Sequence, residues 1–327
     1  MDTEVSESGL LFGFDLLPQH ADRAESLGSL AEGATRDGPI WIHLDRRAQG
    51  LGDDLHTLFK LPAPAIRSLF EEDTRPHADL FDNGMVIVLR GVNFNPGSDP
   101  DDMIAMRMWL TPTALISLRS RHLRTARLVA DEIEAGKVPA TTGQLFNRIA
   151  AGLIGQLENI FDAMEMETDK LEDEAMRKGD SSVRSALWDL RMRILTFRRH
   201  LAPQRMVLDK LTMGEWPALT KDDQTHLRET MHLLARRIDD LDALRERTQF
   251  LHEELSARMG ERMNERMYVL TFVTAICLPL GLLTGLLGIN VGGMPGADND
   301  TAFWAVCGIM VVLVIAQFVY FRIKRWL

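Results

Sequence analysis

The sequence predicts an α+β membrane protein, in which an N-terminal α/β cytoplasmic domain is followed by long stalk helices and two C-terminal transmembrane helices. Three observations carry this prediction. Short apolar runs alternate with helical patterns over about residues 9–135, long periodic stretches follow from Thr141, and two C-terminal segments lack charge. The expected parts are 1–140 (α/β domain), 141–267 (helical stalk), 268–289 (first transmembrane helix), 290–302 (short external loop), 303–321 (second transmembrane helix) and 322–327 (basic cytoplasmic tail).

The N-terminal region reads as a sheet with short helices. Strands are expected where apolar runs lie between turn residues, at Gly9–Leu17, Pro39–Asp45, Met85–Val92, Met103–Leu110 and, after a turn, Ala114–Leu118. Helices are expected at Asp53–Lys60 and Pro64–Phe70. The region contains no nucleophile elbow, no P-loop and no Gly-x-Gly-x-x-Gly, so we expect no enzyme.

The stalk should consist of three long helices, at Gln144–Lys178, Ser182–Leu211 and from Asp222 onward. Pro203 is a candidate kink in the second of them. In the third, apolar residues recur every three or four positions, which marks one buried seam. Because no helix breaker precedes Tyr268, we expect a single helix from Asp222 to about Ile289.

Two uncharged segments, Tyr268–Ile289 and Phe303–Phe321, are each long enough to cross about 30 Å of hydrocarbon. The alternative, a buried hairpin in a soluble core, fits poorly with two full-length spans that have aromatic ends. Arginines precede the first span and a basic tail follows the second, whereas the connecting loop holds only acids. This distribution places both termini in the cytoplasm of a two-span protein of the cell inner membrane.

The overall composition favours a cation as partner and excludes nucleic acid. The 327 residues include 47 Asp and Glu against 37 Lys and Arg, a net charge of -10, and phosphate binding needs bases. Solubility alone is the simpler explanation of this charge. The two cysteines, Cys277 and Cys307, lie in the apolar segments, which excludes a disulfide framework and a usual structural zinc site. The acidic N-terminus is no secretory signal.

One face of the first span is a candidate pore lining, because two helices cannot enclose a pore and several copies would have to surround one. Residues at three/four spacing give this face two hydroxyls and three glycines: Asn264, Met267, Thr271, Thr274, Leu278, Gly281, Gly285 and Gly288. Tight packing of helices in lipid explains the same small residues equally well. Pro279 lies one position off the face and is a candidate kink.

The segment Asn264–Thr271, then Pro279-Leu280, then Gly288-Ile289-Asn290, resembles the CorA superfamily of divalent-metal transporters. Their signature is a glycine, a hydrophobic residue (usually methionine) and an asparagine at the end of the first of two C-terminal spans. Ile289 in place of methionine, and the loop Gly292–Gly296 (GGMPG), are most similar to the ZntB zinc-transporter branch. Leu287 and Gly296 differ from the aromatic residue and the acid usual in magnesium members. The resemblance implies a funnel-shaped homopentamer with the first span lining its pore.

Chemistry at the two ends of that span can be read from the residues. A ring of Asn290 amides would accept hydrogen bonds from the waters of a hydrated cation without binding the metal tightly. Asp298 and Asp300 would concentrate cations at this mouth. Alternatively, these acids only reflect the external location of the loop. At the cytoplasmic end, Met267 and Leu270 could close the pore by dewetting, with Asn264 as an inner polar ring; packing between stalk helices is the alternative for Met267.

Two features of the stalk allow a structural or a metal-related reading. Eight acids crowd residues 158–174; they bind cations or, as we favour, pair with arginines of the next helix. His226, His232 and His252 could sense metal, although scattered histidines are more often structural. No metal-ligand set can be named from the sequence.

The sequence thus predicts transport of zinc, and of other divalent cations with it, through a pentameric pore in a bacterial inner membrane. Zinc is the transported substrate and no cofactor is expected. The resemblance favours proton-coupled uptake, but neither span contains an ionisable residue to relay protons, apart from cysteine and tyrosine. The alternatives are a magnesium or broad divalent channel of the same fold and a membrane-anchored signalling protein. The direction of transport stays open.

Overall fold

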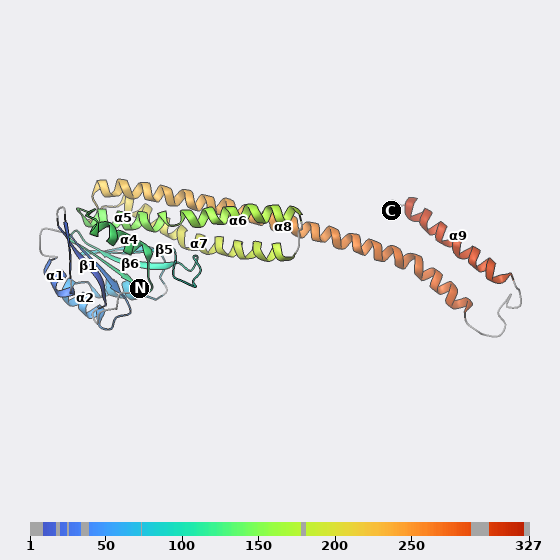
Figure 1. Ribbon diagram of the computed structural model, residues 1–327, viewed down its shortest axis with the longest axis horizontal. Coiled ribbons are helices and arrows are strands. Elements are labelled where there is room, and N and C mark those ends of the chain that lie inside the picture. The colour runs from blue at the N-terminus through green and yellow to red at the C-terminus, as the bar shows by residue number, and fades with distance from the viewer. Residues whose placement is uncertain are drawn as a thin grey trace. The chain divides into compact units, whose positions relative to one another are not determined.

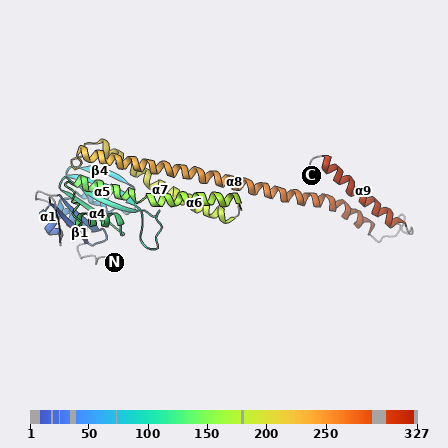
Figure 2. The ribbon, with the colours of Figure 1, turned by 45° about the horizontal axis from the view of Figure 1, so that its top comes forward.

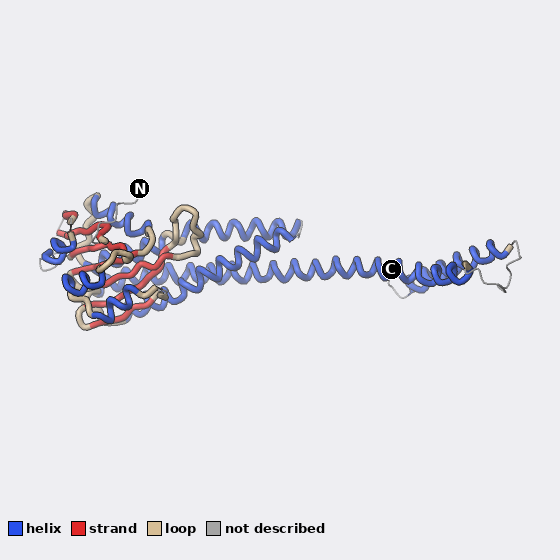
Figure 3. The backbone as a smooth tube through the Cα atoms, turned by 90° about the horizontal axis from the view of Figure 1, so that it is seen from below, coloured by secondary structure: helices blue, strands red, loops and turns tan. Residues whose placement is uncertain are grey.

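The structure is a computed structural model that describes residues 9–17, 20–24, 26–33, 39–72, 74–177, 181–288 and 301–323. The chain divides into two compact units, Met1–His252 and Glu253–Leu327. The first unit contains a mixed seven-stranded sheet in the order β2-β1-β3-β7-β6-β5-β4. The strands are β1 (Leu10–Leu17), β2 (His20–Arg23), β3 (Ile40–Asp45), β4 (His77–Phe81), β5 (Gly84–Gly91), β6 (Ile104–Leu110) and β7 (Ala114–Arg119) (Figure 3).

A central strand of the sheet is β3, which pairs in parallel with β7 and antiparallel with β1. All six residues of β3 are buried, as expected for a strand that is covered on both faces. The other strand pairs are antiparallel, including the β6–β7 hairpin, in which Leu110 lies opposite Leu115. That hairpin and the five strands expected from the sequence are therefore present.

Helices cover the two faces of the sheet. One core is formed by α1 (Leu27–Gly33), α2 (Leu51–Phe59) and α3 (Ala63–Phe70), whose leucines pack against alternate residues of β3 such as Ile42 and Leu44. The opposite face receives α4 (Arg124–Glu134) and α5 (Thr142–Gly155); α5 contacts β5 and β7. A methyl group added at Gly91 of β5 would meet Leu153 of α5 at 2.6 Å, so glycine permits this close approach.

Three further helices complete the first unit and begin the second. They are α6 (Glu158–Arg177), α7 (Ser181–Met213) and the long stalk helix α8 (Lys221–Leu287). Figures 1 and 2 agree that α6, α7 and the first part of α8 run side by side. Against the sheet, α7 is anchored at Gln204, which accepts a hydrogen bond from the backbone N–H of Arg90 (2.6 Å), and at Lys210, which donates to the carbonyl of Ala78 (2.5 Å).

The second unit consists of the last part of α8 and of α9 (Ala302–Ile323). Both helices contain an apolar window long enough to cross a membrane, with mean hydropathy of 2.1 in α8 and 2.5 in α9, and neither window is buried within the chain. Such exposure would be costly in water, because no partner among the described residues buries these side chains. It suits two spans surrounded by lipid or by other copies.

The structure differs from the sequence-based expectations in two respects. The sequence predicts one helix over Gln144–Lys178, but the chain divides there into α5 and α6 at a turn where the N–H of Leu157 donates to the carbonyl of Ile154. Gly155 ends α5, and this helix-breaking residue explains the division. Strands β2 and β4 and helices α1 and α4 are additional elements. Pro203 lies inside α7, so the kink expected there stays a prediction, and α8 ends at Leu287 against an expected end at about Ile289, which lies outside the described residues.

Candidate functional site: the open face of the first span

The residues predicted to line a pore lie together on one side of α8. Every described member of this set is exposed in the single chain: Asn264, Met267, Leu270, Thr271, Thr274, Leu278, Gly281, Gly285 and Gly288. With 3.6 residues per turn, they form one stripe along the last part of the helix. The structure therefore brings the described candidates onto a common face, and their role in a pore stays a prediction.

The second span packs against a different side of α8. Phe272 and Phe321 place their ring centroids 5.5 Å apart, and the side-chain amide of Gln317 donates to the carbonyl of Ala275 at 3.2 Å. Residues Phe272, Ala275 and Pro279 are correspondingly half-buried. Each of these three follows a stripe residue directly, so they lie about 100° around the helix from the candidate pore stripe. Within one chain, α9 therefore leaves the stripe uncovered.

Two glycines of the stripe, Gly281 and Gly285, face open space in the single chain. A methyl group built at Gly281 or Gly285 would meet no atom within 4 Å. Packing of α9 onto these glycines is therefore not what requires their small size in this structure. The small size of these glycines is explained instead by close packing of a second copy of the chain or by an open pore beside them.

Hydroxyl groups of the span donate hydrogen bonds to backbone carbonyls of the same helix. The Oγ1 atom of Thr274 donates to the carbonyl of Leu270 at 2.8 Å, as threonines in membrane helices commonly do. Its oxygen can still accept a hydrogen bond. A ring of such hydroxyls would offer acceptors to the water around a cation without holding the metal itself.

A pocket of about 180 Å³ lies at the N-terminal end of the stripe. Asn264, Met267, Tyr268, Thr271, Phe272 and Phe321 line it. Three of these residues belong to the predicted pore lining, and the two phenylalanines come from the contact between the spans. Asn264 contributes a polar amide to this pocket and Met267 an apolar thioether; that these residues form a constriction of a pore stays a prediction.

Several predicted residues lie outside the part of the chain that the structure describes. They are Ile289 and Asn290 of the motif, and Asp298 and Asp300 of the loop. Gly288 is the last described residue before them, and its N–H donates to the carbonyl of Thr284 at 2.9 Å, so the backbone is still helical in its bonding at the start of the motif.

Four of the eight acids at 158–174 form ion pairs with arginines of α7 or α8, and one of these pairs is with the next helix, as favoured from the sequence. One pair joins α6 to the next helix, where Arg193 donates to Glu167 at 2.6 Å. Others reach α8 instead, which the sequence did not indicate: Arg237 with Glu158 (3.0 Å), and Arg247 with Asp169 (2.7 Å) and Glu172 (2.6 Å). These pairs are partly exposed, so each contributes on the order of 1 kcal/mol or less to stability.

The stalk histidines are not brought together. His226 and His232 are separated by six positions on α8, and His252 lies about 30 Å further along the helix axis. Among the described residues, no group of three or more histidines, cysteines and acids is placed to hold a metal ion.

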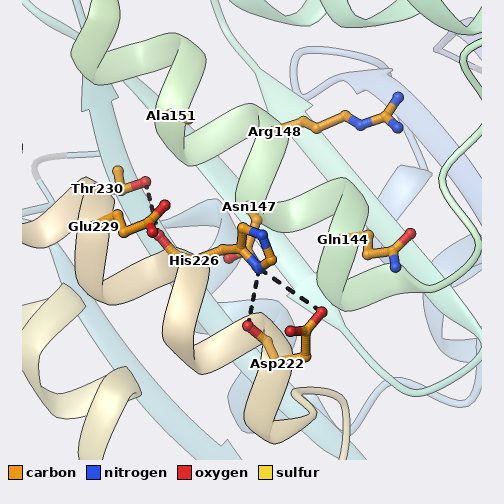
Figure 4. A pocket seen from close by; sticks show the side chains of 8 residues that line it. All are labelled: Gln144, Asn147, Arg148, Ala151, Asp222, His226, Glu229 and Thr230. Atoms are coloured by element: carbon orange, nitrogen blue, oxygen red, sulfur yellow. Dashed lines mark hydrogen bonds and ion pairs between the residues drawn. The ribbon is translucent and has the colours of Figure 1, made fainter.

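His226 instead lines a polar pocket of about 340 Å³ between α5 and the start of α8 (Figure 4). Its Nδ1 lies 3.0 Å from the carbonyl of Asp222. Behind it, the buried amide of Asn147 donates to the carbonyl of Asp223 at 2.8 Å, whereas Arg148 extends away from the other side chains. Asn147 thereby ties α5 to the first turn of α8.

Comparison with known proteins connects this architecture to ion transport. A family model described as "CorA-like Mg2+ transporter protein" matches residues 36–325. The divalent cation transporter CmaX of Pseudomonas aeruginosa is 34% identical over 325 residues, 98% of each chain. The zinc transport protein ZntB of Yersinia enterocolitica is 31% identical over 299 residues, 90% of each chain.

Solved structures share the fold over nearly the whole length. The structure of full-length CmaX has a TM-score of 0.84 at 33% identity and covers 99% of this chain and 100% of its own. The complete CorA magnesium transporter from Methanocaldococcus jannaschii has a TM-score of 0.80 at 20% identity, covering 97% of this chain and 98% of its own. At 20% identity the second likeness concerns the fold alone.

Proposed function

The chain belongs to the family of CorA-like Mg2+ transporter proteins, and we propose that it carries zinc through a pore lined by the exposed stripe of α8. Membership makes it a membrane transporter of divalent cations with two C-terminal spans, and not an enzyme. The alternative of a membrane-anchored signalling protein is thereby set aside. The identity of the cation, the course of the pore and the coupling are the proposal.

The observation that carries the pore proposal is the open face of α8. Two spans from one chain leave this face uncovered, and a methyl group added at Gly281 or Gly285 would meet no described atom within 4 Å. Several copies around an axis would cover it, and the resemblance noted in the sequence implies five. The protein would then act as a homopentamer in the inner membrane, with both termini in the cytoplasm.

Zinc as substrate is supported by the motif residues and by the relatives. Ile289 replaces the usual methionine, and Leu287 and Gly296 replace residues typical of magnesium members. Of the two relatives compared above, one is named for zinc and the other for divalent cations generally. A magnesium or broad divalent channel of the same fold is the second candidate, favoured by the description of the family itself.

Selection would act on the hydrated ion. Zinc is held tightly by cysteine and histidine, and the stripe of α8 contains neither. Amide oxygens of an Asn290 ring would accept hydrogen bonds from the ion's water, while Asp298 and Asp300 raise the local cation concentration. Further in, rings of Met267 and Leu270 would close the path by dewetting, and Asn264 would form the inner polar ring.

Proton coupling, if it accompanies uptake, has to use the water of the pore or the stalk. The spans contain no Asp, Glu, His, Lys or Arg that could pass a proton along. A transporter with such spans would respond to a pH gradient through water in the pore or through titration of groups outside the membrane.

Purified protein in liposomes tests these points. Zinc and magnesium influx are measured separately, each with and without an inward proton gradient. The proposal expects faster zinc than magnesium influx and a further rise with the gradient. Equal or faster magnesium influx would favour the broad divalent channel, and indifference to the gradient would remove the coupling.

A further inference from the structure

A proline in the first span leaves a backbone carbonyl without its usual partner. Pro279 lies inside α8, and proline has no N–H to donate to the carbonyl four residues earlier, which is that of Ala275. A proline ring within a helix also crowds the carbonyl four residues earlier, which favours a local bend. Inside a membrane no bulk water replaces the lost bond, so another group has to satisfy this oxygen.

The second span supplies that group. The Nε2 atom of Gln317 in α9 donates to the carbonyl oxygen of Ala275 at 3.2 Å. Gln317 is the one amide side chain between Ala302 and Phe321, a segment otherwise almost wholly apolar. An amide at this depth is costly unless it finds a partner, and the partner it has is the carbonyl that Pro279 leaves free.

A neighbouring aromatic contact supports the hydrogen bond between Gln317 and Ala275. One helical turn further along α9, Phe321 packs against Phe272 with ring centroids 5.5 Å apart. The two contacts together fix the rotation of α9 about the stretch of α8 that precedes Pro279. The Oε1 atom of Gln317 is buried and has no hydrogen-bond partner among the described residues, so the bond to Ala275 is the interaction that holds the amide.

We propose that Gln317 is a positioning residue for transport, which sets the bend of α8 at Pro279 by capping the carbonyl of Ala275. The inference rests on the proposed function in one respect, because it takes the open stripe of α8 as the pore lining. The bend controls how the residues after Pro279, such as Gly281 and Gly285, are aligned with those before it, such as Met267. Movement of α9 would then change the pore from outside it.

The chain offers a direct test of this coupling as a double-mutant cycle. Gln317→Leu removes the donor and keeps the approximate size, whereas Pro279→Ala restores an N–H that can reach Ala275 along the helix. With Pro279 present, Gln317→Leu should change the rate of cation influx into liposomes about threefold, the size expected for a hydrogen bond between membrane helices. In the Pro279→Ala background, the same substitution should have no effect, because the carbonyl already has a partner.

A second measurement reads the bend itself. Spin labels at two exposed positions, Val269 and Leu286, flank Pro279 in a chain whose two cysteines are replaced by serine. Labelled chains are diluted with unlabelled ones, and the distance distribution within one chain is recorded. Gln317→Leu should broaden or shift this distribution in the Pro279 protein and leave it unchanged in the Pro279→Ala protein.

The outcomes separate the two proposals. If Gln317→Leu changes the distance but not the influx, the cap exists and α8 does not line the pore as proposed. If it changes influx by the same factor in both backgrounds, or leaves the distance unchanged, Gln317 does not act through Ala275 and the inference is wrong. Phe318→Leu, one position away, is the control for general damage to α9.

Discussion

His43 makes the stability of the first unit depend on pH in a way that can be calculated. Its side chain is fully buried in β3, where Nδ1 lies 2.8 Å from the hydroxyl of Ser117. Burial, and after it the charges of Arg119 and His122, lower the pKa of His43 from 6.5 to about 3, against a smaller opposing effect of Asp45. At neutral pH the ring is therefore uncharged.

The sign and size of the effect follow from the two pKa values. Between about pH 6.5 and pH 3 the unfolded chain binds a proton at this histidine and the folded chain does not. Protonation of His43 in the unfolded chain therefore costs no stability well above pH 6.5. As the pH is lowered through this window, the free energy of unfolding falls. From about pH 7 to about pH 4.5 the expected loss from His43 alone is about 2.5 kcal/mol.

Urea unfolding of the full-length protein in detergent, followed by near-ultraviolet circular dichroism, measures this loss. Other ionisable groups also contribute to the pH dependence of stability, so the wild type is compared with His43→Gln, which cannot take up a proton at this position. The wild type should lose about 2.5 kcal/mol more than the variant over this pH range. Equal losses would show that the ring is not held uncharged by burial, and the reasoning would be refuted.

Three other substitutions or insertions test separate parts of the account. Met267→Asp should hydrate the proposed apolar ring and raise the leak of cations into liposomes; unchanged flux with intact oligomers would remove Met267 from the gate. Reporters before Met1 and after Leu327 should both read cytoplasmic, and a tag in the loop at Asp298 should react with an impermeant reagent on cells whose outer membrane has been opened; a protected tag would overturn the assigned orientation. Gly84→Ala should destabilise the β4–β5 hairpin by about 1–3 kcal/mol, because its methyl group would meet the ring of Trp109 at 2.5 Å; wild-type stability in urea would mean that the ring moves aside freely.

The long helices and the central strands were predictable because their patterns are long and unambiguous. The uncharged run after Tyr268 and the absence of a breaker before it predicted the end of α8 to within two residues. Strands at the edges of the sheet were harder to predict from the sequence. β4 (His77–Phe81) is short and mixed in polarity, with Leu80 exposed at 52%, so it has no clean alternation to mark it. β2 (His20–Arg23) is polar throughout except for one alanine.

The candidate pore stripe was also visible in the sequence, since helical spacing alone puts Asn264, Met267 and Thr274 on one side. The role proposed for Gln317 could not be predicted from the sequence. A lone amide in an apolar span is a signal of a polar partner, but only the packing of α9 on α8 identifies that partner as Ala275. Likewise, the arginines that pair with the acids of α6 come largely from α8, which depends on how three helices meet rather than on their order in the chain.

The most direct test of the central claim is zinc influx into liposomes for three variants measured side by side. Asn290→Ala deletes every carbonyl of the proposed ring, whereas Cys277→Ser and Cys307→Ser remove the two thiols of the spans, neither of which belongs to the open stripe of α8. Selection of a hydrated ion predicts a sharp fall in zinc influx for Asn290→Ala and near wild-type influx for both serine variants. Loss of influx in the serine variants, with influx retained in Asn290→Ala, would contradict it and place a sulfur ligand within the membrane.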